Sequence, residues 1–381
     1  TFVGTNDTQY GAAAVVDALI QAQAGDALVA TYSDVLDGTG AGPIDRTAQT
    51  DAIGGADGSA EITLVSQPGD PLYIQVTDAD LNTSLSSAET VSVTVSNSRT
   101  AEVFTVVLTE VDVDDEVFFG SLPTIPGAST ATDMNTAEDD VVTVTYDDVV
   151  TAVGDQQDRT ATDDVIDPWG DADDNESLQA FDAAQVLIDV LSSGTYLSAN
   201  GRLAANVDID PVATGITPFD ASLILQKRVG LIASFPVQDP TSTNHPQGDP
   251  ASAKWIAEQR QLLLVAGEGY MSVMADLRDG IVAGDLLLLG AEGRVEMGAE
   301  LGSFLSAARA TDVGLRVVFA GPISVDGPGE LLRVYGVGLE GVQLVRAAFN
   351  DGAIEGVGSA FSPQLVAPTA FALLPNMPNP F

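Results

Sequence analysis

Residues 171–182 read DADDNESLQAFD and run directly into AAQVLIDVL, while residues 208–220 read DIDPVATGITPFD and run into ASLILQKRVG. The two stretches share a Phe-Asp-Ala junction, at Phe181 and again at Phe219, an offset of 219 − 181 = 38 residues. In each, an acidic loop rich in turn residues is followed by apolar residues at helical spacing. The sequence therefore predicts an internal duplication in which a polar loop precedes a helix twice.

Oxygen-bearing side chains recur along the first loop at the rhythm with which a turning loop presents hard ligands to a calcium ion. The candidate ligands of the first loop are Asp171, Asp173, Asn175, Ser177 through its carbonyl, Gln179 and Asp182. The second loop is one residue longer and offers Asp208, Asp210 and Asp220, with Ala213 near a ligand position. The alternative is that these acids are helix caps and solvated charge, because Asp before an apolar helix is a normal N-cap.

The first loop, the FDAA and FDAS junctions and the helical duplicate, spanning residues 171–230, resemble a type I dockerin. The resemblance implies two calcium loops and a cohesin-type β-sandwich as the partner. Glu176 departs from it, standing where a glycine is expected at the sharp turn. The predicted docking residues on the helices are Leu187, Ile188, Leu191, Leu223 and Ile224. The alternative is that these apolar residues form the core between the two helices.

The segments on either side of the duplication have the alternating, β-branched pattern of strands. Examples are PLYIQVT, TVSVTVS and VFTVVLTE before it, and QLLLVAG, YMSVMADL and GLRVVFAG after it. Helical spacing is scarce there, residues 12–22 being the main case. We expect a mainly β protein of tandem sandwiches with a small α-helical insert.

A second repeat sets the length of one sandwich. GDALVATYSD, followed by DRTAQT, recurs as DDVVTVTYDD, followed by DRTATD, with Tyr32 matching Tyr146 at an offset of 146 − 32 = 114. TFVGTNDT at the start matches VFFGSLPT, with Phe2 against Phe118. Residues 1–52 therefore correspond to the second half of a sandwich, either truncated or completed by another segment. Completion by a neighbouring subunit would be strand complementation, with the tail from Pro363 as the candidate donor.

Three further resemblances follow. The strand repeats resemble the immunoglobulin-like modules of large bacterial surface proteins. The segment after residue 255 resembles a cohesin in GIVAGDLLLL, GPGELLRVYGV and AAFNDGAI. The closing LLPNMPNPF resembles the opening of the C-terminal sorting segment of proteins exported by type IX secretion in Gram-negative bacteria.

The predicted domains are a half immunoglobulin-like sandwich at 1–52, an immunoglobulin-like sandwich at 59–166, a dockerin-like pair at 167–235, a linker at 236–254, a cohesin-like sandwich at 255–360 and an extended tail at 361–381. The composition of the linker predicts that it is exposed and that His245 within it is solvated. In the DADLN turn, Asp78, Asp80 and Asn82 are candidate ligands for another calcium ion, with an Asx-stabilised turn as the alternative.

Composition limits the function. Fourteen basic and 55 acidic residues give a net charge of −41, which repels nucleic acid, favours cations and suits a saline habitat. There is no cysteine, a single histidine and no apolar run long enough for a membrane span. We therefore expect no enzyme activity.

The sequence as a whole predicts a structural subunit of an extracellular or cell-surface filament, exported by a Gram-negative bacterium. Its predicted partners are copies of itself, joined head to tail, or other surface proteins that carry cohesins or dockerins. The alternatives are an accessory or anchoring region of a larger secreted polysaccharide-degrading enzyme, and an adhesin. Whether the dockerin-like and cohesin-like parts pair within one chain or between chains is left open by the sequence.

Overall fold

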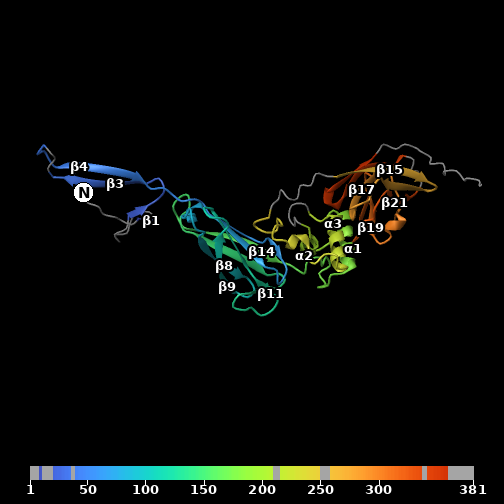
Figure 1. Ribbon diagram of the computed structural model, residues 1–381, viewed down its shortest axis with the longest axis horizontal. Helices are drawn as coiled ribbons and strands as arrows, with labels where there is room; N and C mark the ends of the chain where they lie inside the picture. The colour runs from blue at the N-terminus through green and yellow to red at the C-terminus, as the bar shows by residue number, and fades with distance from the viewer. Residues whose placement is uncertain are drawn as a thin grey trace, which may run out of the picture. The chain divides into compact units, whose positions relative to one another are not determined.

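The structure, a computed structural model, describes residues 8–10, 20–35, 39–208, 215–248, 258–336 and 341–358. The fold is mainly β with a small helical part, as the alternating sequence pattern predicts (Figure 1). Two compact units divide the chain. The first consists of Thr1–Ile166 with Asn244–Gly248, and the second of Asp167–Thr243 with Asp249–Phe381.

The first unit begins with short strands and a hairpin. They are β1 (Thr8–Tyr10), β2 (Ile20–Ala22), β3 (Ala27–Asp34) and β4 (Ile44–Asp51). β1 pairs with β2 in parallel, and β3 pairs with β4 in antiparallel register. Residues 12–22 have helical spacing in the sequence, but the last three of them, Ile20–Ala22, form strand β2. The rest of this stretch lies outside the described residues.

A β-rich module with its own apolar core follows within the same unit. Its strands are β5 (Ser59–Ile62), β6 (Val65–Ser66), β7 (Leu72–Thr77), β8 (Thr90–Asn97), β9 (Val103–Glu110), β10 (Val117–Leu122), β11 (Thr124–Ile125), β12 (Met134–Asn135), β13 (Val141–Asp148) and β14 (Gln157–Val165). Eight of them form one sheet in the order β5-β7-β10-β9-β8-β13-β14-β6, and β5 also contacts β14. Alternate residues of β7, β8 and β13 point into one apolar core, as a period of two requires.

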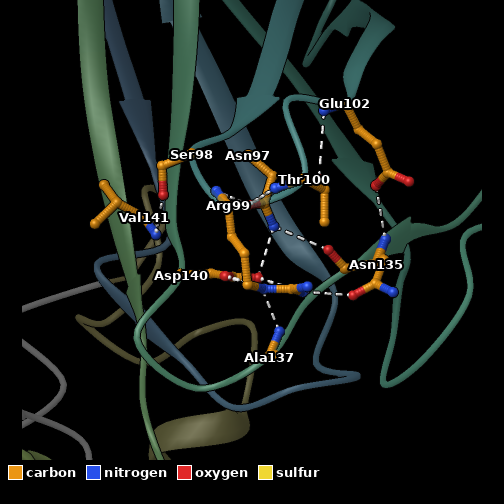
Figure 2. A network of polar contacts seen from close by, with 9 residues as sticks. All are labelled: Asn97, Ser98, Arg99, Thr100, Glu102, Asn135, Ala137, Asp140 and Val141. Atoms are coloured by element: carbon orange, nitrogen blue, oxygen red, sulfur yellow. Dashed lines mark hydrogen bonds and ion pairs between the residues drawn. The ribbon is translucent and has the colours of Figure 1, made fainter.

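A polar network holds the β8–β9 turn against the start of β13 (Figure 2). The side chain of Asp140 is fully buried and accepts hydrogen bonds from Arg99 at 2.6 Å, Asn97 at 2.7 Å and the Ala137 amide at 2.9 Å. Burial alone would raise the pKa of Asp140, but these hydrogen bonds and the charge of Arg99 lower it below its usual value. Arg99 also donates to Asn135 at 2.6 Å. The network therefore depends on Asp140 being ionised.

The stretch after residue 235 is not the exposed linker that its composition predicts. Val237 is buried in a short 3-10 helix, Pro236–Gln238, of the second unit. In the first unit, Asn244 is buried and forms two hydrogen bonds with the backbone of Val65, at 2.7 and 3.0 Å.

The prediction that His245 is solvated is wrong. The ring is buried, its Nδ1 lies 3.0 Å from Oγ1 of Thr63, and it packs edge-on against Tyr73 with ring centroids 4.8 Å apart. Proline-rich composition does not reveal which residues a neighbouring sheet covers, so this contact is not predictable from the sequence.

Three helices open the second unit. They are α1 (Ala180–Leu191), α2 (Ala199–Ala205) and α3 (Pro218–Arg228). α1 and α3 begin 218 − 180 = 38 residues apart, the offset of the sequence duplication, and each starts with a capping box. The two helices pack on each other.

A nine-stranded sheet completes the second unit. Its strands are β15 (Glu258–Gly267), β16 (Tyr270–Ala275), β17 (Ala283–Leu289), β18 (Arg294–Met297), β19 (Leu305–Ala310), β20 (Leu315–Ala320), β21 (Gly329–Tyr335), β22 (Gln343–Phe349) and β23 (Ile354–Gly358). The order is β18-β21-β16-β15-β23-β22-β17-β20-β19, and one apolar core lies inside it. Gly284 is required on β17, because a Cβ there would meet the rings of Phe319 and Phe349 within 3 Å.

Candidate metal centre and docking face

The first acidic loop wraps around the carboxylate of Asp171. This side chain is fully buried, and the backbone amides of Asn175 and Ser177 donate to its two oxygens at 3.2 and 3.0 Å. Glu176, between them, has φ +62°. The turn expected of a glycine therefore forms with a glutamate, at a cost on the order of 1 kcal/mol.

Three carboxylates converge in this loop. One oxygen from each of Asp171, Asp173 and Asp182 lies within 4.8 Å of the other two, and no other such group of acidic or histidine side chains occurs in the described part of the chain. Burial raises the pKa of Asp171 and, with the charges of Asp173 and Asp171, raises that of Asp182 to about 6. Like charges held this close favour a cation between them, and hard oxygen donors fit Ca²⁺.

The other predicted ligands of the first loop lie at its exposed side. Asn175 donates its side-chain amide to Asp173 and lies 3.4 Å, Oδ1 to Nε2, from Gln179. Rotating the side-chain amide of Asn175 by 180° places its oxygen where its NH₂ group now lies, next to Asp173. Ser177 and Gln179 are exposed. The structure thus brings three of the six predicted ligands together directly, while Asn175 bonds to Asp173 and the backbone amides of Ser177 and Gln179 donate to Asp171 and Asp182.

The second loop presents fewer of its predicted ligands. Asp220 is fully buried, and its carboxylate accepts hydrogen bonds from the amides of Thr217 and Val207, both at 2.9 Å, and of Asp208 at 3.2 Å. Burial raises the pKa of Asp220. Asp208 is buried nearby, whereas Asp210 and Ala213 lie outside the described residues. Asp220 serves as a helix cap, the alternative that the sequence left open.

Asp182 has the same capping geometry at α1. It accepts from the amide of Gln179 at 2.6 Å and from that of Ala172 at 3.2 Å. Capping and ion binding are therefore both open to Asp182, because a carboxylate has about four lone-pair sites.

The side chains of the DADLN turn form hydrogen bonds both within the turn and to other parts of the first unit. Asp78 accepts the amide of Asp80 at 2.9 Å and the hydroxyl of Tyr146, while Asp80 accepts the amide of Ala56 at 2.8 Å. Asn82 donates to Asp114 at 3.2 Å. The bond from the Asp80 amide to Asp78 is that of an Asx-stabilised turn, the alternative to a further calcium site.

The helical pair packs on one face of the sheet in its own chain. α1 contacts β19 and β20, and α3 contacts β17 and β20. Two arginines of the sheet meet the C-terminal end of α1: Arg316 donates to the carbonyl of Val190 at 2.8 Å, and Arg309 to that of Leu191 at 3.2 Å. Cations at this end satisfy carbonyls that have no partner within the helix and oppose the helix dipole.

On α3, the buried hydroxyl of Ser222 donates to the Gly321 carbonyl at 2.7 Å. Arg316 is in turn fixed by Asp285, which accepts from its Nε at 3.0 Å and its Nη2 at 2.9 Å. A cavity of about 280 Å³ remains between the start of α3 and the sheet. The helices are thus held to the sheet by directed polar bonds as well as by apolar contact.

The predicted docking residues have two kinds of environment. Leu187, Leu191, Leu223 and Ile224 are buried, whereas Ile188 is 36% exposed. The arginines were missed, because nothing in the sequence of β19 or β20 relates Arg309 and Arg316 to a helix more than a hundred residues earlier.

Comparison with known proteins adds little to this geometry. No family model matches the sequence, and no curated protein matches it. Among solved structures, the chain is similar to a non-cellulosomal cohesin from the hyperthermophilic archaeon Archaeoglobus fulgidus, at 17% identity, over 27% of this chain and 92% of that chain, with a TM-score of 0.20. Similarity at that level assigns no function to this chain. In the described residues, no helix is long and apolar enough to cross a membrane.

Proposed function

We propose that this chain is a structural subunit of an extracellular surface assembly, in which a dockerin-like helical pair and a cohesin-like sandwich form one rigid body. The observation that carries this proposal is the set of bonds from Arg309, Arg316 and Ser222 that join helices and sheet within one chain. Docking within the chain stiffens the subunit and occupies the sheet face that would otherwise take a helical pair from another protein.

Calcium is the proposed cofactor of the first loop. Asp171, Asp173 and Asp182 would hold it, with Asn175, Gln179 and the carbonyl of Ser177 as further ligands. The ion would neutralise carboxylates that otherwise repel one another at the start of α1. The first loop leads into α1, and α1 carries the carbonyls that Arg309 and Arg316 bind. Ordering of the loop by calcium is therefore coupled to docking of α1 on the sheet.

The acidity of the chain supports an extracellular, saline setting. At high salt the electrostatic repulsion among the charges of a chain with a net charge of −41 is screened. We place the subunit outside a Gram-negative cell on the resemblance of LLPNMPNPF to a sorting segment, and we propose a structural rather than a catalytic role.

Electron microscopy of the purified chain, with calcium and with a chelator, tests this proposal. We expect filaments or ordered clusters that loosen when calcium is removed. Asp171→Asn with Asp173→Asn should loosen them at any calcium concentration and should weaken calcium binding, measured by titration calorimetry, by at least about tenfold, because it removes two charged ligands.

Glu176→Gln is the matched control, since it removes a charge from the same loop but not from the carboxylate cluster. It should leave both readouts near wild type. Dispersed monomers of the wild-type chain under both conditions would exclude the assembly, and an unchanged calcium affinity in the double variant would exclude this loop as the ion site.

A further inference from the structure

Two hairpins in the first unit have the same register. In β13–β14, Tyr146 stands opposite Arg159, and in β3–β4, Tyr32 stands opposite Arg46. Each hairpin has eight consecutive paired positions. The short strands before them also agree, because β1–β2 and β11–β12 are both parallel pairs. The elements β1 to β4 therefore repeat β11 to β14.

The surroundings of the two hairpins differ. β13 lies between β14 and β8, and its inward residues Val142 and Val144 are fully buried, with Tyr146 only 3% exposed. Within the described residues, β3 has β4 as its one strand partner. Tyr32, the equivalent of Tyr146, is 65% exposed, and every residue of β4 is exposed.

The complete module shows where a partner of β3 would lie. β8 pairs antiparallel with residues 142–145 of β13. At the repeat offset of 114, these positions correspond to residues 28–31, since 142 − 114 = 28 and 145 − 114 = 31. An isolated two-stranded hairpin is marginally stable, and an open strand edge with apolar neighbours recruits another strand.

We propose that residues 369–374 of a second copy of this chain add to β3 as an antiparallel strand along residues 28–31. This inference rests on the proposed function and names the joint between subunits. The resulting contact joins two different surfaces and so propagates head to tail without closing on itself.

The sequence of the tail suits this role. The window TAFALL at 369–374 lies between Pro368 and Pro375 and contains no proline, so every residue in it keeps the N–H group that a sheet needs. Six residues exceed the four that β8 pairs with β13. Phe371 and Leu373 are two positions apart, as are the buried Val93 and Val95 of β8, so they share one face of a strand.

Charge also favours the tail. Residues 359–381, after the end of β23, contain no Asp, Glu, Lys or Arg, although the whole chain carries 55 acidic residues. An uncharged segment approaches a second, strongly acidic copy without the repulsion that an acidic strand would meet. Residues 369–374 are therefore apolar enough to pack against β3 and carry no charge that would oppose their approach to it.

The test uses the full chain and a variant that lacks residues 363–381. In multi-angle light scattering and electron microscopy, the full chain should assemble and the deletion variant should be monomeric. Phe371→Asp with Leu373→Asp should also give monomers, while Asn376→Asp with Asn379→Asp should assemble normally, because it adds the same charge outside the window.

A peptide of residues 363–381, added to the deletion variant, gives an independent readout. It should slow amide hydrogen exchange in β3 by at least about tenfold while leaving β13 unchanged. Normal filaments from the deletion variant, with the wild type also assembling, would overturn the tail as donor but leave the proposed function standing. Absence of protection by the peptide, or a monomeric full chain with β3 already protected, would also overturn the inference.

Discussion

The hairpins β3–β4 and β13–β14 have related sequences and the same register, yet β3 and β4 are exposed along nearly their whole length whereas β13 buries alternate residues in a core. Local pattern and turn chemistry are enough to pair two strands. Burial of Val142, Val144 and Tyr146 requires strands from elsewhere, chiefly β8. A hairpin's own sequence thus specifies the pairing of its two strands, whereas neighbouring strands supply the burial of its side chains. Matched substitutions in the two hairpins test this distinction.

The largest difference is expected for the matched tyrosines. Tyr146→Ala should destabilise the sandwich by about 3 to 5 kcal/mol, because it empties a buried site and removes the hydroxyl that Asp78 accepts. Tyr32→Ala should change the unassembled chain by less than about 0.5 kcal/mol. Urea unfolding of each hairpin, followed by pulse-labelling hydrogen exchange, measures the two changes in unfolding free energy. Equal losses of stability in the two variants would contradict the difference in burial between Tyr146 and Tyr32.

A smaller contrast concerns Asp163 in β14 and its counterpart Thr50 in β4. Burial, aided by the charges of Asp164 and Asp70, raises the pKa of Asp163 to about 8, although the Ser66 hydroxyl hydrogen-bonds to it. The folded module keeps this proton between pH 4 and 8, where the unfolded chain releases it. Its stability should therefore fall as pH rises, by at most about 1.4 kcal/mol per pH unit.

Asp163→Asn should abolish that slope, since an amide does not titrate in this range. The urea midpoint of β13–β14, compared at pH 5 and pH 8 in wild type and variant, checks the expectation. A wild-type midpoint that rises with pH would show that Asp163 is ionised in the folded module.

The smallest contrast is expected for the arginines opposite the tyrosines. Arg159 donates to the buried carboxylate of Asp148 at 3.0 and 3.1 Å and to the exposed Asp57 at 2.9 Å. Arg159→Gln should cost about 1 to 2 kcal/mol, mostly from leaving Asp148 short of donors. Arg46→Gln, on the exposed hairpin, should be nearly neutral in the same urea assay; a comparable loss there would mean that Arg46 is also part of a core.

Much of the fold was predictable because its signals are local. Alternating residues in β7, β8, β9 and β13 predicted strands, and the 38-residue duplication predicted that α1 and α3 begin at equivalent places. The spacing in DADDNESLQAFD predicted which acids meet, and Asp171, Asp173 and Asp182 do converge. Turning loops bring alternate residues together whatever the rest of the chain does.

Other features depended on residues far apart in the sequence. Composition placed His245 in solvent, but the ring is buried against Tyr73. Helical spacing extended to Ile20–Ala22, yet pairing with β1 made that segment a strand. In both cases a tertiary contact outweighed a weak local preference.

By itself, the sequence determined the strands, the duplicated loop and helix, the cluster of acidic side chains and the kinship of the two hairpins, since each rests on neighbours along the chain. Only the tertiary structure decided that the helices lie on the sheet of their own chain and that Arg309 and Arg316 bind the end of α1. It alone also decided that β13 is buried on one face while β3 and β4 are exposed. Burial and long-range hydrogen bonds belong to pairs of surfaces, and no single segment specifies its partner.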